Sequence, residues 1–247
     1  MKSYLIVANW KQNGDSSLCA EYLKIKKTDH AIVVCPPYHL LSELKLPHGY
    51  FLGAQNVSPF PNGSYTGEIG AEMLKKANVS YCIVGHSERR ELFKETVEHF
   101  ASKIKLLLSF SITPIICVGE SIADYKLEKG NSVVRSQLTS LLSTLDPICA
   151  PIIVAYEPIW SIGTGLIPTS EYIISITDMI KSCMVLFRNK NIIHDKILYG
   201  GSVNEDTIST TLSIREIQGV LVGGASLKIE SFNKLIVSYT SRDKRSF

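Results

Sequence analysis

The sequence of 247 residues lacks any apolar run of the ~18 residues that a membrane span requires. Its apolar amino-terminal stretch, residues 4–9, is too short for a signal peptide and leads directly into polar residues, so we expect a first strand there. No run of basic residues is interleaved with aromatic ones, and the net charge is only +3. We therefore expect neither a membrane nor a nucleic acid as a partner.

Paired cysteines are also missing. None of the six cysteines belongs to a CxxC pair, so neither a zinc site nor a disulfide scaffold is indicated. Cys35, Cys82 and Cys117 lie in apolar, strand-like runs, where we expect buried, reduced thiols. The sequence predicts no metal site and favours the cytoplasm as the compartment of the protein.

Short β-branched runs alternate with longer amphipathic ones, and no linker or low-complexity segment divides the chain. Strands are predicted at Tyr4–Asn9, Ala31–Cys35, Tyr50–Gln55, Tyr81–Gly85, Thr113–Val118, Ile152–Tyr156, Lys196–Tyr199 and Gly219–Val222. Helices are predicted at Glu95–Ser109, Ser132–Leu145, Ser170–Asn189 and Lys228–Tyr239. Eight such strand–helix units in this length favour one α/β domain over residues 1–247, a single (β/α)8 barrel. A doubly wound open sheet is the alternative, but no GxGxxG motif follows the first strand.

The segment Ala155–Gly165 is the most informative part of the chain. Pro158 cannot continue a strand, so Glu157 is expected at the carboxyl end of the sixth strand, where barrels of this kind build their active sites. Trp160 and two glycines follow, a composition that suits a loop that opens and closes over an anion. The segment predicts a carboxylate base beside a lid, although Glu157 alone could equally be a buried ion-pair partner.

Polar residues follow other predicted strands. Asn9 and Lys11 alternate after the first strand, so both can point into the barrel mouth, where a cation would stabilise a developing oxyanion. Ser87 is expected to cap a helix, which places His86 near the positive helix end and favours a neutral, hydrogen-bond-donating imidazole. A surface lysine and a merely capped helix start are the alternative interpretations.

Glycine pairs follow the seventh and eighth predicted strands, in Gly200-Gly201-Ser202 and Gly223-Gly224. Glycine pairs are more often tight turns, but barrels frequently bind a phosphate with the loops in this position. A base, a cation, a neutral donor and a phosphate site at one barrel mouth are together a specific pattern.

In their order along the chain, these motifs resemble those of the triosephosphate isomerase family. The similar blocks are Asn9-Trp10-Lys11, 53–56, 85–90, 155–165, 199–204 and 221–227. The resemblance implies a TIM barrel that interconverts dihydroxyacetone phosphate and D-glyceraldehyde 3-phosphate through an enediolate. It also implies a role in glycolysis and gluconeogenesis, with no metal or organic cofactor.

The resemblance further implies roles for individual residues. Glu157 would be the general base, while His86 and Lys11 would polarise the carbonyl and Asn9 would assist at the oxygen. Lys11 would also contact the substrate. The phosphate would bind the amides of Gly163, Ser202, Gly223 and Gly224, and the supporting residues would be Glu88, Cys117 and Thr66.

A homodimer is implied as well. The long loop 56–68 would insert into a second copy of the chain, and Thr66 would reach the partner's Asn9 and the partner's His86. From its residues alone, this loop indicates only an exposed segment with two aromatic side chains.

The lid departs from the family pattern at two places. Leu166-Ile167-Pro168 replaces a Lys-Thr-Ala-like hinge, and Pro168 restricts its own backbone and that of Ile167, so we expect a stiffer closing end. Ser161 replaces the usual alanine, which we expect to be a mild change.

Two competing functions are a barrel enzyme for a larger sugar phosphate and an inactive barrel that serves as a binding protein. The short lid argues against the first, and the presence of Lys11, His86 and Glu157 argues against the second.

Overall fold

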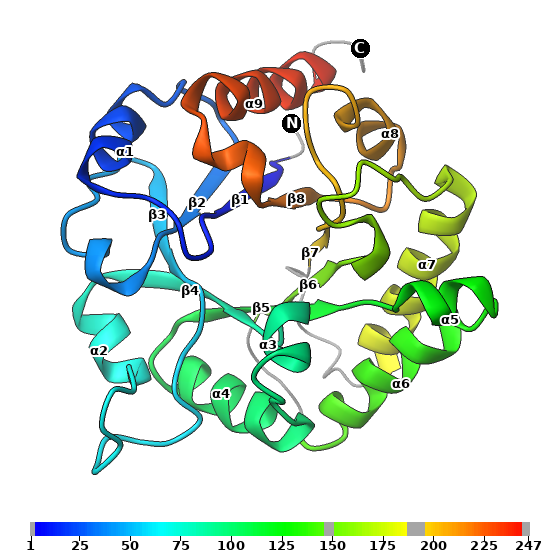
Figure 1. Ribbon diagram of the computed structural model, residues 1–247, viewed down its shortest axis with the longest axis horizontal. Coiled ribbons are helices and arrows are strands. Elements are labelled where there is room, and N and C mark those ends of the chain that lie inside the picture. Colours follow the sequence, from blue (N-terminus) through cyan, green and yellow to red (C-terminus); the bar gives the residue numbers. More distant parts are fainter. Residues whose placement is uncertain (1–2, 146–150, 187–195, 244–247) are drawn as a thin grey trace.

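Eight parallel strands close into a barrel in the order in which they occur along the chain (Figure 1). The structure is a computed structural model that describes residues 3–145, 151–186 and 196–243. The strands are β1 (Leu5–Asn9), β2 (Ala31–Cys35), β3 (Tyr50–Ala54), β4 (Val79–Val84), β5 (Thr113–Val118), β6 (Ile153–Tyr156), β7 (Lys196–Tyr199) and β8 (Gly219–Val222). Pairing of β8 with β1 completes the ring, so the predicted (β/α)8 barrel is confirmed.

Helical segments connect the strands and form an outer layer around the barrel (Figure 1). The α-helices are α1 (Ser16–Glu21), α2 (Ala71–Lys76), α3 (Ser87–Glu91), α4 (Val97–Ser109), α5 (Ile122–Lys126), α6 (Gly130–Leu142), α7 (Ser170–Leu186), α8 (Ile208–Ser213) and α9 (Ile229–Asp243). The 3₁₀ helices are η1 (Tyr22–Lys24), η2 (Tyr38–Leu40), η3 (Ile159–Ser161) and η4 (Gly224–Leu227). Within the described ranges, no helix has the length and apolar character needed to cross a membrane.

The four predicted helices correspond to α4, α6, α7 and α9, with ends that differ by a few residues. Residues 187–189, the end of the predicted helix Ser170–Asn189, lie outside the described residues. The α4 helix begins two residues later than predicted because Thr96 caps it, accepting a hydrogen bond from the His99 amide at 3.4 Å. Hydrophobic periodicity locates such a helix, whereas the capping side chain determines where it begins.

Side chains alternate along each strand between the inside of the barrel and the helix layer. On β1, Leu5 and Val7 belong to the cluster inside the barrel, while Ile6 and Ala8 pack in the larger cluster beneath the helices. The thiols of Cys35, Cys82 and Cys117 are buried and free, as the sequence predicts, and Cys149 lies outside the described residues. The interior of the barrel is therefore a packed core and not a pore.

The closure between β8 and β1 depends on a residue without a side chain. A methyl group added at Gly219 would lie 1.9 Å from the carbonyl oxygen of Leu5, the residue with which Gly219 pairs. Backbone cannot move away from such a contact without losing strand pairing. Gly219 thus permits the close approach on which the closed barrel depends.

We expect Gly219→Ala to lower the free energy of unfolding by roughly 3 kcal/mol, the upper end of ordinary overpacking, because the clash is with backbone. Urea unfolding followed by circular dichroism at constant protein concentration measures this loss. Gly224→Ala is the matched control, since a methyl group there meets nothing within 4 Å. Equal stability of the two variants would contradict the close approach at Gly219.

Candidate active site

The carboxyl ends of the strands open into a cavity of about 500 Å³. Its lining comes from the loops after β1, β4, β6, β7 and β8, which are distant in sequence. The lining includes every residue predicted to be catalytic or to bind substrate, namely Asn9, Lys11, His86, Glu157, Gly163, Ser202, Gly223 and Gly224. The supporting residues Glu88, Cys117 and Thr66 do not line it.

Glu157 lies directly after β6 and is only 2% exposed. Its Oε2 accepts a hydrogen bond from the Ser87 amide at 3.4 Å, and its Oε1 lies 3.4 Å from His86 Nε2. Glycines frame it on two sides: a methyl group at Gly119 would lie 1.7 Å from the Glu157 carbonyl oxygen, and one at Gly200 would lie 2.8 Å from its Cγ. The glycine after β5 therefore leaves space for the backbone of Glu157, and the glycine after β7 leaves space for its side chain.

His86, not Ser87, is the N-cap of α3. The His86 Nδ1 atom accepts a hydrogen bond from the Glu88 amide at 3.2 Å, so the sequence-based assignment of the cap to Ser87 is wrong. An imidazole is an uncommon cap, which is why the residue types alone favoured the serine. An Nδ1 that accepts must be unprotonated, which leaves the ring proton on Nε2, the atom that faces Glu157. The cap thus sets the tautomer of His86.

Lys11 has a left-handed backbone conformation, with φ of 54°, that residues other than glycine rarely adopt. Two side chains hold it there: Asn9 Oδ1 accepts from the Lys11 amide at 3.1 Å, and Gln55 donates to the Lys11 carbonyl oxygen at 2.8 Å. Lys11 Nζ forms an ion pair with Glu88 Oε1 at 2.5 Å. The strained backbone directs the lysine into the cavity and the ion pair holds its charge there.

Glycine-rich loops line the side of the cavity next to Lys11. A methyl group at Gly223 would lie 3.5 Å from Lys11 Cε, so the lysine side chain lies alongside this backbone. Gly224 begins the 3₁₀ helix η4, and Gly163 lies in the loop between η3 and α7. Amides that no side chain shields, next to a cation, are suited to an anion of the size of a phosphate.

Two of the supporting residues contact the predicted catalytic ones, and the third does not. Glu88 pairs with Lys11, as described above. Cys117 lies in the barrel interior, where burial and then the nearby Glu157 carboxylate raise the pKa of its thiol well above its ordinary value, so it stays protonated. Thr66 is exposed, in the loop after β3 that projects from the ring of helices in Figure 1.

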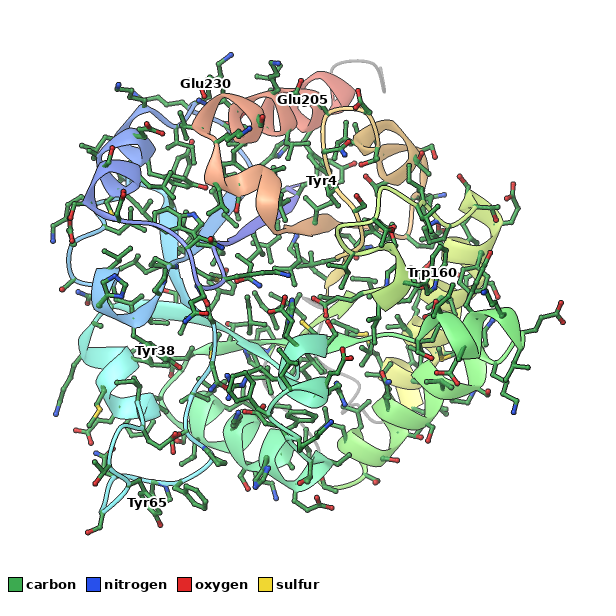
Figure 2. The ribbon with its side chains drawn as sticks, in the orientation of Figure 1. Tyr4, Tyr38, Tyr65, Trp160, Glu205 and Glu230 are labelled. Carbon is green, nitrogen blue, oxygen red and sulfur yellow. The ribbon has the colours of Figure 1, made fainter. Side chains whose placement is uncertain are left out.

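Glu120 contacts the lid from below, a role that sequence reasoning did not assign to it. Its Oε1 accepts hydrogen bonds from Trp160 Nε1 at 2.8 Å, Tyr156 Oη at 3.1 Å and Tyr172 Oη at 3.3 Å. Trp160 also stacks on Tyr125 with ring centroids 4.2 Å apart. Figure 2 shows Trp160 on the side of the barrel where α5 and α7 lie. These contacts attach the first part of the lid to the barrel.

A second polar network was also missed because its members are distant in sequence. Glu95 Oε1 pairs with Arg89 Nε at 2.6 Å and with Lys103 Nζ at 2.5 Å. Lys103 is only 1% exposed, and it also donates to Asn56 Oδ1 at 2.7 Å. The network connects α4 to the segment after His86 and to the start of the loop 56–68. A buried lysine in an amphipathic helix pattern is the one signal that could have revealed it.

The described residues contain no group of three or more His, Cys, Asp or Glu side chains placed to hold a metal ion. The polar groups of the cavity are instead a carboxylate, an imidazole, an ammonium group and glycine amides. This set can move a proton, donate a hydrogen bond to an oxygen and hold an anion.

Fold and cavity together define a protein of the (β/α)8-barrel class with a polar cavity at the carboxyl ends of its strands. A sequence model of the family described as triosephosphate isomerase matches residues 4–239. The chain belongs to the triosephosphate isomerase family, and the assignment made from its motifs is confirmed.

Curated relatives named triosephosphate isomerase match over most of their length. The protein of Halorhodospira halophila is 41% identical over 94% of this chain and 96% of its own. That of Mesomycoplasma hyorhinis is 38% identical over 96% and 98%, and that of Francisella tularensis subsp. holarctica is 37% identical over 94% and 95%.

The buried carboxyl of Glu120 should make the stability of the protein depend on pH. Burial raises its pKa, and the hydrogen bonds from Trp160, Tyr156 and Tyr172 oppose this shift only in part. Because the pKa of Glu120 is higher in the folded protein than in the unfolded one, the protonated form of Glu120 stabilises the fold. This contribution of Glu120 to the free energy of unfolding is fully present below the unfolded-state pKa of about 4.3. It is lost as the pH rises through the folded-state pKa. We expect Glu120→Gln to remove this loss.

Urea unfolding of both proteins between pH 4 and pH 8 tests this. The wild type should lose stability relative to Glu120→Gln as the pH rises. The loss should be about 1.4 kcal/mol for each tenfold difference in the proton affinity of Glu120 between the folded and the unfolded protein. The slope is the readout, because any constant cost of the amide cancels from it. A difference that stays constant over this range would contradict the prediction.

Proposed function

We propose that the protein interconverts dihydroxyacetone phosphate and D-glyceraldehyde 3-phosphate through an enediolate. The observation that carries the proposal is the placement of Glu157 Oε1 and His86 Nε2, 3.4 Å apart on the wall of a cavity that also contains Lys11. A proton acceptor and a neutral donor that face each other can act on adjacent atoms of one small substrate. Membership of the family supports the choice of substrate.

Glu157 is the general base in this proposal. Its carboxylate takes a proton from the carbon next to the substrate carbonyl and returns it to the neighbouring carbon, so the proton moves between C1 and C2, while the hydroxyl proton moves between the oxygens on the same two carbons. The adjacent carbonyl acidifies the carbon-bound proton, and no other group needs to be oxidised or reduced. A base that is 2% exposed is also shielded from competing water.

His86 and Lys11 stabilise the negative charge that develops on the substrate oxygen. The Nε2–H of His86 donates to this oxygen, since Nδ1 is occupied by the Glu88 amide. Lys11, oriented by Glu88, supplies the positive charge, and Asn9 contributes a further polar group at the same wall. Fixed donors in a largely buried site stabilise such charge more strongly than water does.

The substrate phosphate binds the amides of Gly163, Ser202, Gly223 and Gly224 in this proposal. Gly163 belongs to the lid 158–168, which begins with the buried Pro158 and ends with the buried Pro168. Closure of the lid excludes water and restrains the enediolate from expelling its phosphate. Pro168 would confine the motion of the closing end to fewer dihedrals.

We further propose that residues 1–247 form one domain, that the enzyme acts in the cytoplasm and that it is a homodimer. The loop 56–68 projects beyond the helix layer, with Tyr65 at its outer part (Figures 1 and 2). Phe60 and Tyr65 stack with centroids 4.4 Å apart and are each 42% exposed. Thr66 does not line the cavity of its own chain, so its supporting role requires the site of a partner.

A second exposed apolar surface supports the dimer. Leu92 and Phe93 follow α3 directly and are 69% and 64% exposed. Exposed aromatic and aliphatic side chains next to a catalytic loop are typical of a surface that another chain covers. The loop of the partner would cover this surface in the proposed dimer.

Turnover of glyceraldehyde 3-phosphate in a coupled assay tests the reaction and its base. We expect Glu157→Asp to lower kcat by about 10²-fold, because it withdraws the carboxylate by roughly 1 Å. Glu205→Asp is the matched control, at an exposed residue that pairs with Lys234 and is placed at the edge of the molecule in Figure 2. A folded wild type without turnover, or equal rates for both variants, would refute the proposal.

For the dimer, we expect Tyr65→Asp to weaken self-association at least about 10-fold, because a charge in an apolar contact loses its water. Sedimentation velocity over a range of concentrations measures this. Leu127→Asp serves as control, since Leu127 is 63% exposed and lies at the end of α5. A monomeric wild type, or equal dissociation of both variants, would show that the loop 56–68 is not the interface.

A further inference from the structure

The hydroxyl of Ser161 joins three segments of the active site. It donates to the Leu166 carbonyl oxygen at 2.6 Å, accepts from the Ser202 amide at 3.2 Å and lies 3.5 Å from Tyr199 Oη. Ser161 is 0% exposed, so its own hydroxyl is shielded from water. Ser161, whose replacement of the usual alanine looks mild in the sequence, therefore links both ends of the lid to the loop after β7.

The loop after β7 is shaped for this contact. A methyl group at Gly201 would lie 2.3 Å from Tyr199 Oη and 3.0 Å from Ser161 Oγ. Only a residue without a side chain allows the lid and this loop to approach so closely. The hydrogen bond between Ser161 and Ser202 therefore depends on the absence of a side chain at Gly201.

The lid also has hydrogen bonds within itself. Thr164 Oγ1 donates to the carbonyl oxygens of Trp160 and Ser161, at 3.0 and 3.2 Å, and accepts from the Leu166 amide at 3.2 Å. Together with the Ser161–Leu166 bond, these contacts hold the lid together as a unit. They can persist when the lid moves, whereas the Ser161–Ser202 bond joins the lid to the barrel and cannot.

The Ser202 amide thus has two acceptors that compete for it. In this structure, Ser161 Oγ accepts from it. In the proposed function, on which this inference rests, the same amide donates to the substrate phosphate. One amide proton cannot form two full hydrogen bonds, so the phosphate must replace the serine hydroxyl.

We propose that Ser161 is a positioning residue that competes with the substrate phosphate for the Ser202 amide. With no ligand, its hydroxyl satisfies this partly buried donor and holds the lid to the loop after β7. When a phosphate arrives, the exchange of acceptors releases the lid from that loop. Ser161 therefore weakens phosphate binding and couples it to lid release.

Calorimetric titration with glycerol 3-phosphate tests this proposal on the full-length wild type, Ser161→Ala and Thr164→Val. We expect Ser161→Ala to bind the probe roughly five-fold more tightly, which corresponds to one neutral hydrogen bond that need not be displaced. The KM for glyceraldehyde 3-phosphate should fall by a similar factor without a matching rise in kcat. Without ligand, the Ser202 amide should exchange its hydrogen faster in Ser161→Ala.

Thr164→Val is the matched control because it removes hydrogen bonds within the lid and none to Ser202. It should not tighten binding. Equal tightening by both variants would show general loosening of the lid and overturn the proposal. So would unchanged or weaker binding by a Ser161→Ala protein that unfolds at the wild-type temperature.

The same titration separates this proposal from the proposed function. A wild type that turns over glyceraldehyde 3-phosphate and binds the probe, but has the same affinity as Ser161→Ala, would overturn only the role of Ser161. A wild type that is folded but neither binds the probe nor turns over substrate would overturn the phosphate site, and the role of Ser161 with it.

Discussion

Closure of the eight-stranded sheet, completed by the pairing of β8 with β1, is the constraint on which the remaining structure depends. Because all strands are parallel, closure brings the carboxyl end of every strand to one rim. Asn9 and Glu157, which are distant in sequence, thereby line one cavity. The same closure buries alternate side chains inside the barrel, so the rim is the part of the barrel where polar groups remain accessible. Gly219 matters to the site for this reason, although it lies at the start of its strand.

Backbone amides and neighbouring polar side chains together fix the orientation of the polar groups at this rim. The Glu88 amide sets the tautomer of His86, and the Ser87 amide holds the Glu157 carboxylate. Gln55 and Asn9 stabilise the unusual backbone of Lys11. His86, Glu157 and Lys11 are therefore each held in one orientation by hydrogen bonds with neighbouring groups, which would leave little reorganisation for the proposed reaction. The lid differs, because side-chain hydroxyls and one indole nitrogen attach it to the barrel.

The lid contains the two departures from the family pattern noted in the sequence, at Ser161 and at Leu166-Ile167-Pro168, beside Trp160, which matches that pattern. Its Trp160 donates to a buried carboxylate, its Ser161 occupies an amide of the loop after β7, and its closing end is a proline. Two of these features tie the lid to the barrel before a ligand binds, and the third limits how its end can turn. Binding of a phosphate would therefore have to supply free energy for lid release as well as for contact with the substrate.

The sequence by itself determined the barrel, the approximate positions of the eight strands and the polar residues and glycines predicted to act at the cavity. Strands and helices leave periodic signals within short windows, and proline after Glu157 marks a strand end in the same local way. Only the tertiary structure decided which group caps α3, what lies under Trp160, how Lys103 is paired and where the Ser161 hydroxyl points. These features depend on contacts between distant segments at the scale of single hydrogen bonds. Residue types and spacing do not select the partner at that scale, because many partners satisfy the same donor equally well.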